Sequence, residues 1–165
     1  MEQTNFTCKS IGIVHTPFKQ AEGTPIQPVK GKGVKGWVEI DNAYVDGLKD
    51  LDGFERIWLL FWCHRSSEVK LQVKPYMDRE IRGLFSTRAP SRPNAIGMSC
   101  VKLLSVEGNR LNIEDVDILD GTPLLDIKPY VKKFDHFQVS RCGWTDNAVS
   151  EDTQADNRFF QKENQ

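Results

Sequence analysis

The sequence predicts a mainly β protein: a single-sheeted β-barrel of about six or seven strands with one or two short helices. Apolar segments of strand length recur along the chain, with turn residues between them. Few of these segments alternate with helical patterns, so a parallel sheet built from βαβ units is not expected. The length of 165 residues favours one domain with its own core. A twisted sheet that closes on itself fits these observations best.

The first strands are expected in the N-terminal third of the chain. Residues 6–15 alternate roughly between apolar and polar, as a half-buried strand does. A loop with three prolines and three glycines follows at 16–35, and loops of that length inside a domain are usually functional or disordered. A strand is predicted at 37–40. After it, Asp41 or Asn42 caps a short helix.

The most apolar segment lies near the middle of the chain. The sequence IWLLFWC, within 56–64, is apolar on both faces and predicts a central buried strand. A further strand is expected at 69–76, ended by a proline. The pair Gly108-Asn109 is a two-residue hairpin signal between predicted strands at 98–107 and 110–119. One more strand is possible at 134–144.

The strand pattern weakens towards the C-terminus. We expect a barrel domain over residues 1–131 and a C-terminal extension over 132–165, with a possible short helix. Residues 150–165 are polar apart from Phe159 and Phe160. This tail is either a short helix that docks through those two rings or a frayed end.

Composition narrows the function classes. The net charge is −1, but a basic block at 65–102 (eight Lys or Arg, three acids) precedes an acidic one at 107–126 (six acids, one Arg). Such asymmetry fits a nucleic-acid face or two facing charged strands. The four cysteines form no CxxC pair, so neither a metal site nor a disulfide is expected. No nucleophile elbow, HExxH motif or P-loop occurs.

The N-terminus has no basic start followed by an apolar core, and the longest apolar run, at 57–63, is too short to span a bilayer. We therefore expect a cytoplasmic protein without membrane contact. The GxGxxG pattern at 31–36 follows a proline-bearing loop and precedes a strand. A dinucleotide fingerprint needs the reverse order, strand then helix, so a turn is the better interpretation.

Two segments carry the functional signal. The first, STRAPSRPNAIGMS at 86–99, holds Arg88, Arg92 and Asn94 on a backbone that prolines stiffen. Arginine side chains bind carboxylate or phosphate with two parallel hydrogen bonds. Either arginine alone is more often a surface ion pair, but the combination on a rigid loop favours a binding site.

The second segment, DVDILDGTPLLDIKPY at 115–130, turns at an Asp-Gly pair. A carboxylate at such a turn, as at Asp120, can accept two ribose hydroxyls. Asp126 is a further carboxylate, Lys128 a donor and Tyr130 a stacking ring. We expect this segment, from 117 onwards, to meet the arginine loop in one nucleotide-type site. His64-Arg65, at the end of the buried strand, would lie at its mouth, although such a histidine is more often structural.

Four motifs occur in the order seen in the TsaA/TrmO family, which the chain resembles from about 11 to 131: IGIVHTPF, LDGFERIWLLFWCH, STRAPSRPNAIGMS and LDGTPLLDIKPY. The resemblance implies a β-barrel methyltransferase that uses S-adenosylmethionine. It implies a homodimer with the cofactor near the subunit interface. The implied reaction methylates the exocyclic amine of threonylcarbamoyl-adenosine, beside the anticodon of a tRNA.

The resemblance also implies residue roles, carried over position by position. The cofactor-contacting set falls on Pro28, Val29, Lys30, His64, Arg65, Arg88, the backbone near Cys100, Leu119, Asp120, Gly121 and Thr122. The site-shaping or RNA-facing set is Arg92, Asn94, Asp126, Lys128 and Tyr130. From the basic block, Arg79, Arg82 and Arg92 offer phosphate contacts, so RNA binding would weaken steeply with salt.

Methyl transfer to a poorly nucleophilic nitrogen needs positioning and, in addition, an acceptor for the proton of that nitrogen. Arg88 suits the cofactor's carboxylate and Asp120 its ribose. Asp120, Asp126 and His64 are all candidates for the catalytic acceptor. The alternatives are a non-catalytic cofactor or nucleotide sensor, an RNA-binding barrel that reads a base, and a small-molecule methyltransferase.

Overall fold

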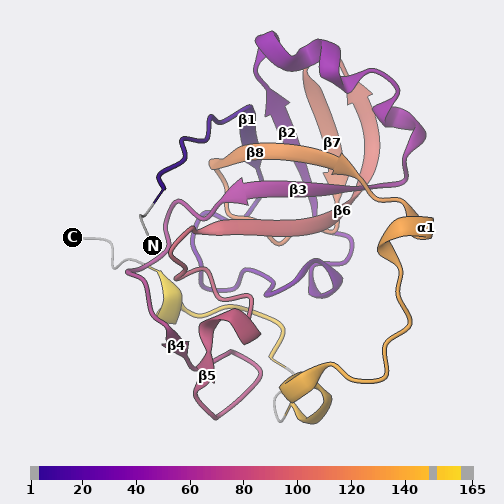
Figure 1. Ribbon diagram of the computed structural model, residues 1–165. Helices are drawn as coiled ribbons and strands as arrows, with labels where there is room; N and C mark the ends of the chain where they lie inside the picture. The colour runs from indigo at the N-terminus through magenta and orange to yellow at the C-terminus, as the bar shows by residue number, and fades with distance from the viewer. Residues whose placement is uncertain (1–3, 149–151, 161–165) are drawn as a thin grey trace.

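The computed structural model describes residues 4–148 and 152–160, and its main feature is a closed antiparallel barrel (Figure 1). The strands follow one another around the barrel in the order β1-β2-β7-β6-β3-β8. The mainly β barrel fold predicted from the sequence is confirmed. The strand bounds are β1 (Gly12–His15), β2 (Lys35–Ile40), β3 (Arg56–Trp62), β6 (Ile96–Glu107), β7 (Arg110–Glu114) and β8 (Thr122–Pro129).

Branched aliphatic side chains fill the barrel. Buried and outward-facing residues alternate along the strands, so one face of each strand lines the barrel interior. The hairpin between β6 and β7 turns at Gly108, whose φ of 62° suits glycine, as its sequence predicted. The fully buried side chains include Val14, Val38, Ile57, Leu59, Val101, Leu111, Ile113 and Leu124.

Three predicted strands are shorter than expected. The first covers only Gly12–His15, because its partner β2 ends at Ile40, opposite Gly12. The strand expected at 110–119 ends at Glu114, where Asp115 takes a left-handed conformation with φ 66°. The strand expected at 69–76 is reduced to β4 (Gln72–Val73), which pairs only with the two residues of β5 (Arg82–Gly83).

The described helices are short. Over residues 4–148 and 152–160 the single α-helix is α1 (Lys132–Asp135). The predicted cap at Asp41 is present, because its carboxylate accepts a bond from the Ala43 amide. No strand forms at 134–144, because the closed barrel leaves no free edge to extend. The 3₁₀ helices are η1 (Pro28–Lys30), η2 (Asn42–Leu48), η3 (Leu51–Gly53), η4 (Leu84–Ser86), η5 (Gly143–Asn147) and η6 (Asn157–Phe159).

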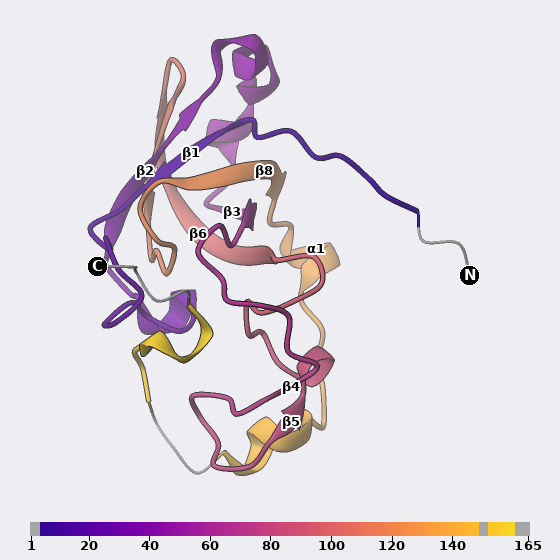
Figure 2. The ribbon, with the colours of Figure 1, turned by 90° about the vertical axis from the view of Figure 1, so that its left-hand side faces the viewer.

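A lower layer, made of β4, β5, η4, η5 and η6, lies beneath one end of the barrel (Figures 1 and 2). The C-terminal segment 152–160 holds this layer together. Phe159 is only 3% exposed and packs with Val73 and Leu84. Backbone bonds join Ala155 to Gly23 and Thr24. Of the two possibilities considered for the tail, docking through a phenylalanine is the one observed over these residues.

Candidate functional site

A cleft of about 820 Å³ is lined by residues of one barrel end and of the lower layer. This volume falls in the range of small-molecule and cofactor sites. The arginine loop and the acidic turn both line it, as the sequence predicted. The lining comes mainly from residues 24–27, 63–65, 75–77, 85–90, 96–99 and 117–119, with Phe61, Thr122, Trp144 and Phe159 among the others.

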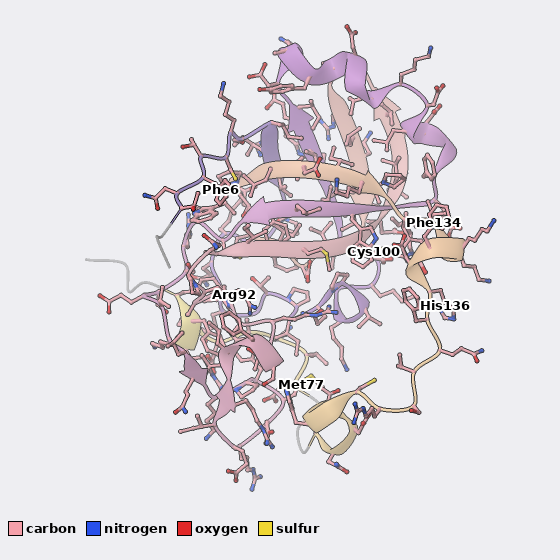
Figure 3. All side chains as sticks on the ribbon, viewed as in Figure 1. Phe6, Met77, Arg92, Cys100, Phe134 and His136 are labelled. Atoms are coloured by element: carbon pink, nitrogen blue, oxygen red, sulfur yellow. The ribbon has the colours of Figure 1, made fainter. Side chains whose placement is uncertain are left out.

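The two arginines of the loop have different surroundings. Arg88 is exposed in the cleft, and its Nη1 donates to the side chain of Gln27, next to η1. Arg92 (labelled in Figure 3) also belongs to the cleft lining, but its guanidinium donates to the backbone carbonyl of Thr87 at 3.0 Å and lies over the ring of Phe85. Arg92 therefore braces the loop, whereas Arg88 presents its charge to the cleft.

Asp117 brings a carboxylate into the same cleft, and the sequence reasoning gave it no role. Ser99 Oγ on β6 donates a 2.6 Å hydrogen bond to Asp117 Oδ1. Burial raises the pKa of Asp117 to about 6, against the opposing effects of Ser99 and Arg88. Burial and the nearby Asp117 raise the pKa of Cys63 to about 11, so this thiol stays protonated at neutral pH.

His64 and Arg65 follow β3 and both line the cleft. His64 Nδ1 lies 3.4 Å from Thr122 Oγ1, at the start of β8. Burial, followed by the positive charge of Arg65, lowers the pKa of His64, so its ring is neutral at pH 7. Arg65 also donates to the carbonyl of Lys19 at 2.8 Å, which ties the end of β3 to the long loop.

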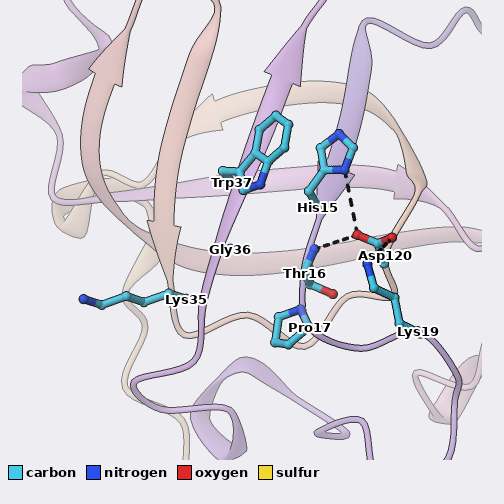
Figure 4. Close-up of a pocket in the computed structure, with 8 residues that line it drawn as sticks. All are labelled: His15, Thr16, Pro17, Lys19, Lys35, Gly36, Trp37 and Asp120. Carbon is cyan, nitrogen blue, oxygen red and sulfur yellow. Dashed lines mark hydrogen bonds and ion pairs between the residues drawn. The ribbon is translucent and has the colours of Figure 1, made fainter.

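Asp120 does not line the large cleft, although its neighbours Leu119 and Thr122 do. Its carboxylate faces a separate pocket of about 370 Å³ (Figure 4). There Oδ1 accepts a 3.0 Å bond from the Thr16 amide and Oδ2 lies 2.7 Å from Lys19 Nζ. Burial alone would raise the pKa of Asp120, but the contacts with Lys19 and Thr16 outweigh this effect and lower the pKa below its usual value. Asp120 therefore fastens the acidic turn to the end of β1.

The turn itself brings the chain back to the cleft. Gly121, with φ 74°, takes the left-handed conformation, and its amide donates to the Val14 carbonyl. Thr122 then donates its hydroxyl to the Leu119 carbonyl at 2.7 Å. Leu119 and Thr122 are thereby held at the cleft while Asp120, between them in sequence, points away.

Three other residues of the acidic segment lie on or beside β8, away from the cleft. Asp126 and Lys128 form an exposed 2.8 Å ion pair. The ring of Tyr130 packs 6.0 Å from that of Trp58. The structure therefore does not bring Asp126 together with Arg88 and His64. Asp126, Lys128 and Tyr130 share a barrel face instead.

The remaining predicted cofactor contacts lie at the margin of the cleft or outside its lining. Pro28, Val29 and Lys30 form η1, directly after the cleft residue Gln27, and Val29 is 78% exposed. Cys100 lies on β6 one residue beyond Ser99, and its carbonyl accepts from Arg56 at 3.4 Å (Figure 3). Their roles stay predictions.

The predicted phosphate-binding residues lie partly in the lower layer. Arg82 begins β5 and pairs with Asp78 at 2.7 Å. Arg79 lies exposed on the loop between β4 and β5, and Asn94 is exposed on the arginine loop. Arg92 donates to backbone carbonyls and Arg82 is half-buried beside Asp78, so Arg79 is the exposed arginine of this set.

Residues 4–148 and 152–160 hold no cluster of three or more His, Cys, Asp or Glu side chains fit for a metal ion. None of the helices in that part of the chain has the length and apolarity to cross a membrane.

Fold and site together define a closed antiparallel β-barrel protein with a nucleotide-sized cleft at one barrel end. Residues 13–136 match the model of a family described as the tRNA-methyltransferase O N-terminal domain. The chain belongs to this family, as its four motifs predicted.

Relatives in the family differ in length. A probable S-adenosyl-L-methionine-binding protein of Pyrococcus abyssi is 49% identical over 154 residues, which cover 92% of this chain and 84% of the relative. The mouse tRNA (adenine(37)-N6)-methyltransferase is 36% identical over 82% of this chain but 33% of its own. A crystal structure of TrmO from Pseudomonas aeruginosa superposes with a TM-score of 0.72 at 34% identity, over 85% of this chain and 62% of that one. The chain thus spans less than two thirds of that solved TrmO.

Proposed function

We propose that the protein is an S-adenosylmethionine-dependent tRNA methyltransferase that acts on the exocyclic amine of threonylcarbamoyl-adenosine next to the anticodon. Family membership and the relatives named as tRNA (adenine(37)-N6)-methyltransferases support the reaction. The relatives named as S-adenosyl-L-methionine-binding proteins support the cofactor. The observation that carries the proposal is the single cleft lined by both the arginine loop and the acidic turn.

The cleft suits the chemical groups of S-adenosylmethionine. Arg88 offers a guanidinium to a carboxylate. Asp117 supplies negative charge near a sulfonium or ammonium. Phe61, Phe85 and Met98 give apolar surface for an adenine ring. When bound, the cofactor supplies an electrophilic methyl group, and the protein's task is to position it against the acceptor nitrogen.

The homodimer is part of the proposal, because an apolar patch on the outside of the barrel is continuous with the cleft. Trp62 on β3 pairs with Ile96 on β6, and Leu60 pairs with Met98. Trp62 is 39% and Met98 50% exposed. Ile96 and Met98 also line the cleft. A second copy that covered this patch would close one side of the cleft and place the cofactor near the interface.

The tRNA is proposed to approach the cleft along the lower layer. Arg79 is exposed on the loop between β4 and β5, Arg82 begins β5 at the end of that loop, and the cleft residues Tyr76 and Met77 belong to the same loop. Phosphate contacts there would set the backbone while the target base enters the cleft. Asn94, Lys128 and Tyr130 are proposed to contact RNA at the edges. We place this activity in the cytoplasm.

The test uses the purified protein, methyl-labelled S-adenosylmethionine and two pools of tRNA, one with threonylcarbamoyl-adenosine and one from cells that cannot make it. Mass spectrometry of the nucleosides should find the label on threonylcarbamoyl-adenosine in the first pool, and no label in the second. Label on unmodified adenosine in the second pool would refute the proposed acceptor. Cofactor binding without methyl transfer to either pool would refute the proposed methyltransferase activity and would favour a non-catalytic cofactor sensor.

A further inference from the structure

Two side chains that can take up a proton face the cleft at its barrel end: His64, after β3, and Asp117, before β8. Asp120 and Asp126, the carboxylates that sequence reasoning favoured, do not line the cleft. Asp120 is committed to Lys19 and Thr16, and Asp126 to Lys128. Their positions therefore favour Asp117 or His64, and not Asp120 or Asp126, as the proton acceptor.

Asp117 is held in one orientation from a neighbouring strand. Ser99 Oγ donates to its Oδ1 at 2.6 Å, and Ser99 is itself buried, at 2% exposure, on β6. This bond fixes one oxygen of the carboxylate against the barrel wall. Asp117 is at the same time one of the residues that line the cleft. A fixed group at the cleft wall meets the geometric requirement of a general base.

We propose that Asp117 accepts the proton that the substrate amine loses during methyl transfer. This inference rests on the proposed function. The nitrogen lone pair forms the new bond to the methyl carbon as the carbon–sulfur bond breaks, and that bonding pair stays on sulfur as a neutral thioether. The nitrogen then carries a positive charge, which it loses when its N–H proton passes to the ionised Asp117 carboxylate. Atoms and charge balance without any further reactant.

The electrostatic surroundings support this role. Burial raises the pKa of Asp117 to about 6, so it is a stronger base than an ordinary carboxylate yet is still ionised at pH 7. Arg88 on the arginine loop and Ser99 on β6 act in the opposite direction and keep it ionised. Cys63, after β3, is the other titratable neighbour, and its thiol stays neutral.

His64 has the opposite environment. Burial and Arg65 lower its pKa, which makes the imidazole a weaker base than usual. Its Nδ1 also lies 3.4 Å from Oγ1 of Thr122, the first residue of β8. His64 therefore positions the acidic turn through Thr122, and a His64 variant separates its role from that of Asp117.

The experiment measures single-turnover methylation of threonylcarbamoylated tRNA at saturating cofactor between about pH 5 and about pH 9. The proteins are wild type, Asp117→Asn, Ser99→Ala, His64→Gln and a control, Asp46→Asn, on the exposed helix η2 outside the cleft. Thermal unfolding and cofactor calorimetry accompany each variant. The ¹³C shift of the Asp117 carboxyl, followed by NMR without cofactor, gives its pKa directly.

The wild-type rate should rise with pH through about 6, matching the titration of the carboxyl in the NMR spectrum. Asp117→Asn should fold, lose this dependence and react roughly a hundredfold or more slowly. Ser99→Ala should move both the rate profile and the carboxyl titration to higher pH, because the lost bond favours the charged form. Asp46→Asn should match wild type.

Three results would overturn the proposal. One is an Asp117→Asn rate within about threefold of wild type. Another is loss of the pH dependence in His64→Gln instead. The third is a large loss of cofactor affinity in Asp117→Asn with an unchanged rate at saturation, which would confine Asp117 to cofactor binding and leave it no part in proton transfer. Failure of the wild type to methylate tRNA would remove the proposed function itself, a distinct outcome that takes this inference with it.

Discussion

Ser99 Oγ and Asp117 Oδ1, 2.6 Å apart, join β6 to the acidic turn at the wall of the cleft. The bond connects the two segments that carry the functional motifs, because Ser99 ends the arginine loop sequence and Asp117 begins the acidic one. A contact between a buried hydroxyl and a carboxylate of raised pKa has consequences for stability as well as for catalysis.

The stability of the protein should depend on the ionisation of Asp117. Its pKa of about 6 in the folded state exceeds the value of about 4 expected in the unfolded chain, so the folded state holds the proton more tightly. Protonated Asp117 therefore contributes up to about 3 kcal/mol to the free energy of unfolding. This contribution is full below about pH 4 and is lost as the pH rises through about 6. Asp117→Asn should lack this fall. Unfolding curves of the two proteins that run parallel from about pH 4 to about pH 8 would contradict the assignment.

Arg88→Ala should lose at least about tenfold in affinity for S-adenosylmethionine while the fold survives, because the exposed Arg88 side chain contributes charge rather than packing. Calorimetry measures the affinity, and a melting curve reports the fold. Arg110→Ala, an exposed arginine over Trp37 outside the cleft, is the matched control and should bind normally. Equal affinities in the two variants would remove Arg88 from the site.

Asp120→Asn should reduce turnover by loosening the acidic turn rather than by removing a group from the cleft. The ion pair with the exposed Lys19 is worth about 1 kcal/mol or less. Because the pKa of Asp120 is lowered in the folded state, this stability is present above the unfolded pKa of about 4 and is lost as the pH falls through the folded value. Denaturant titrations at neutral and acidic pH measure both effects. A variant that matches wild type in turnover and in stability at pH 7 would refute this role.

Phe159→Ala should destabilise the lower layer by about 3 kcal/mol, because it removes a buried ring that packs with Tyr76, Val73 and Leu84. Since Phe159 also lines the cleft, cofactor affinity should fall with it. Hydrogen exchange at the Ser67 amide, which donates to the Phe159 carbonyl, reports the local loosening. Phe137→Ala, with its ring 74% exposed, controls for loss of a phenylalanine. Equal exchange in both variants would show that the tail does not hold the cleft.

The barrel was predictable because its signals are local. Apolar and polar residues alternate in β2 and β6, and β3 is apolar on both faces. The turn at Gly108 is marked by its own two residues, so each of these elements can be predicted from a short stretch of sequence. The meeting of the arginine loop and the acidic turn was also inferred correctly, since both combine rigid turns with polar side chains. Asp120 and Asp126, two carboxylates that the sequence assigned to this site, do not line the large cleft, and their roles stay predictions.

The positions of these carboxylates have two physical causes. Asp115 takes a left-handed backbone without being glycine, so the strand alternation ends early and Asp117 points into the cleft while Asp115 pairs with Arg56. Asp120 is held away from the cleft by its ion pair with Lys19, a residue 101 positions earlier in the chain. Neither a strained conformation nor a long-range ion pair leaves a mark in local sequence.

The central claim is that one cleft, between the arginine loop and the acidic turn, seats S-adenosylmethionine. A crystal structure of the protein with S-adenosylhomocysteine tests it most directly. The account predicts the ligand in the 820 Å³ cleft, with its carboxylate on Arg88 and Asp117 within reach of its sulfur or amine. Ligand in the small pocket of Lys19 and Asp120 instead, with the large cleft occupied only by water, would contradict it.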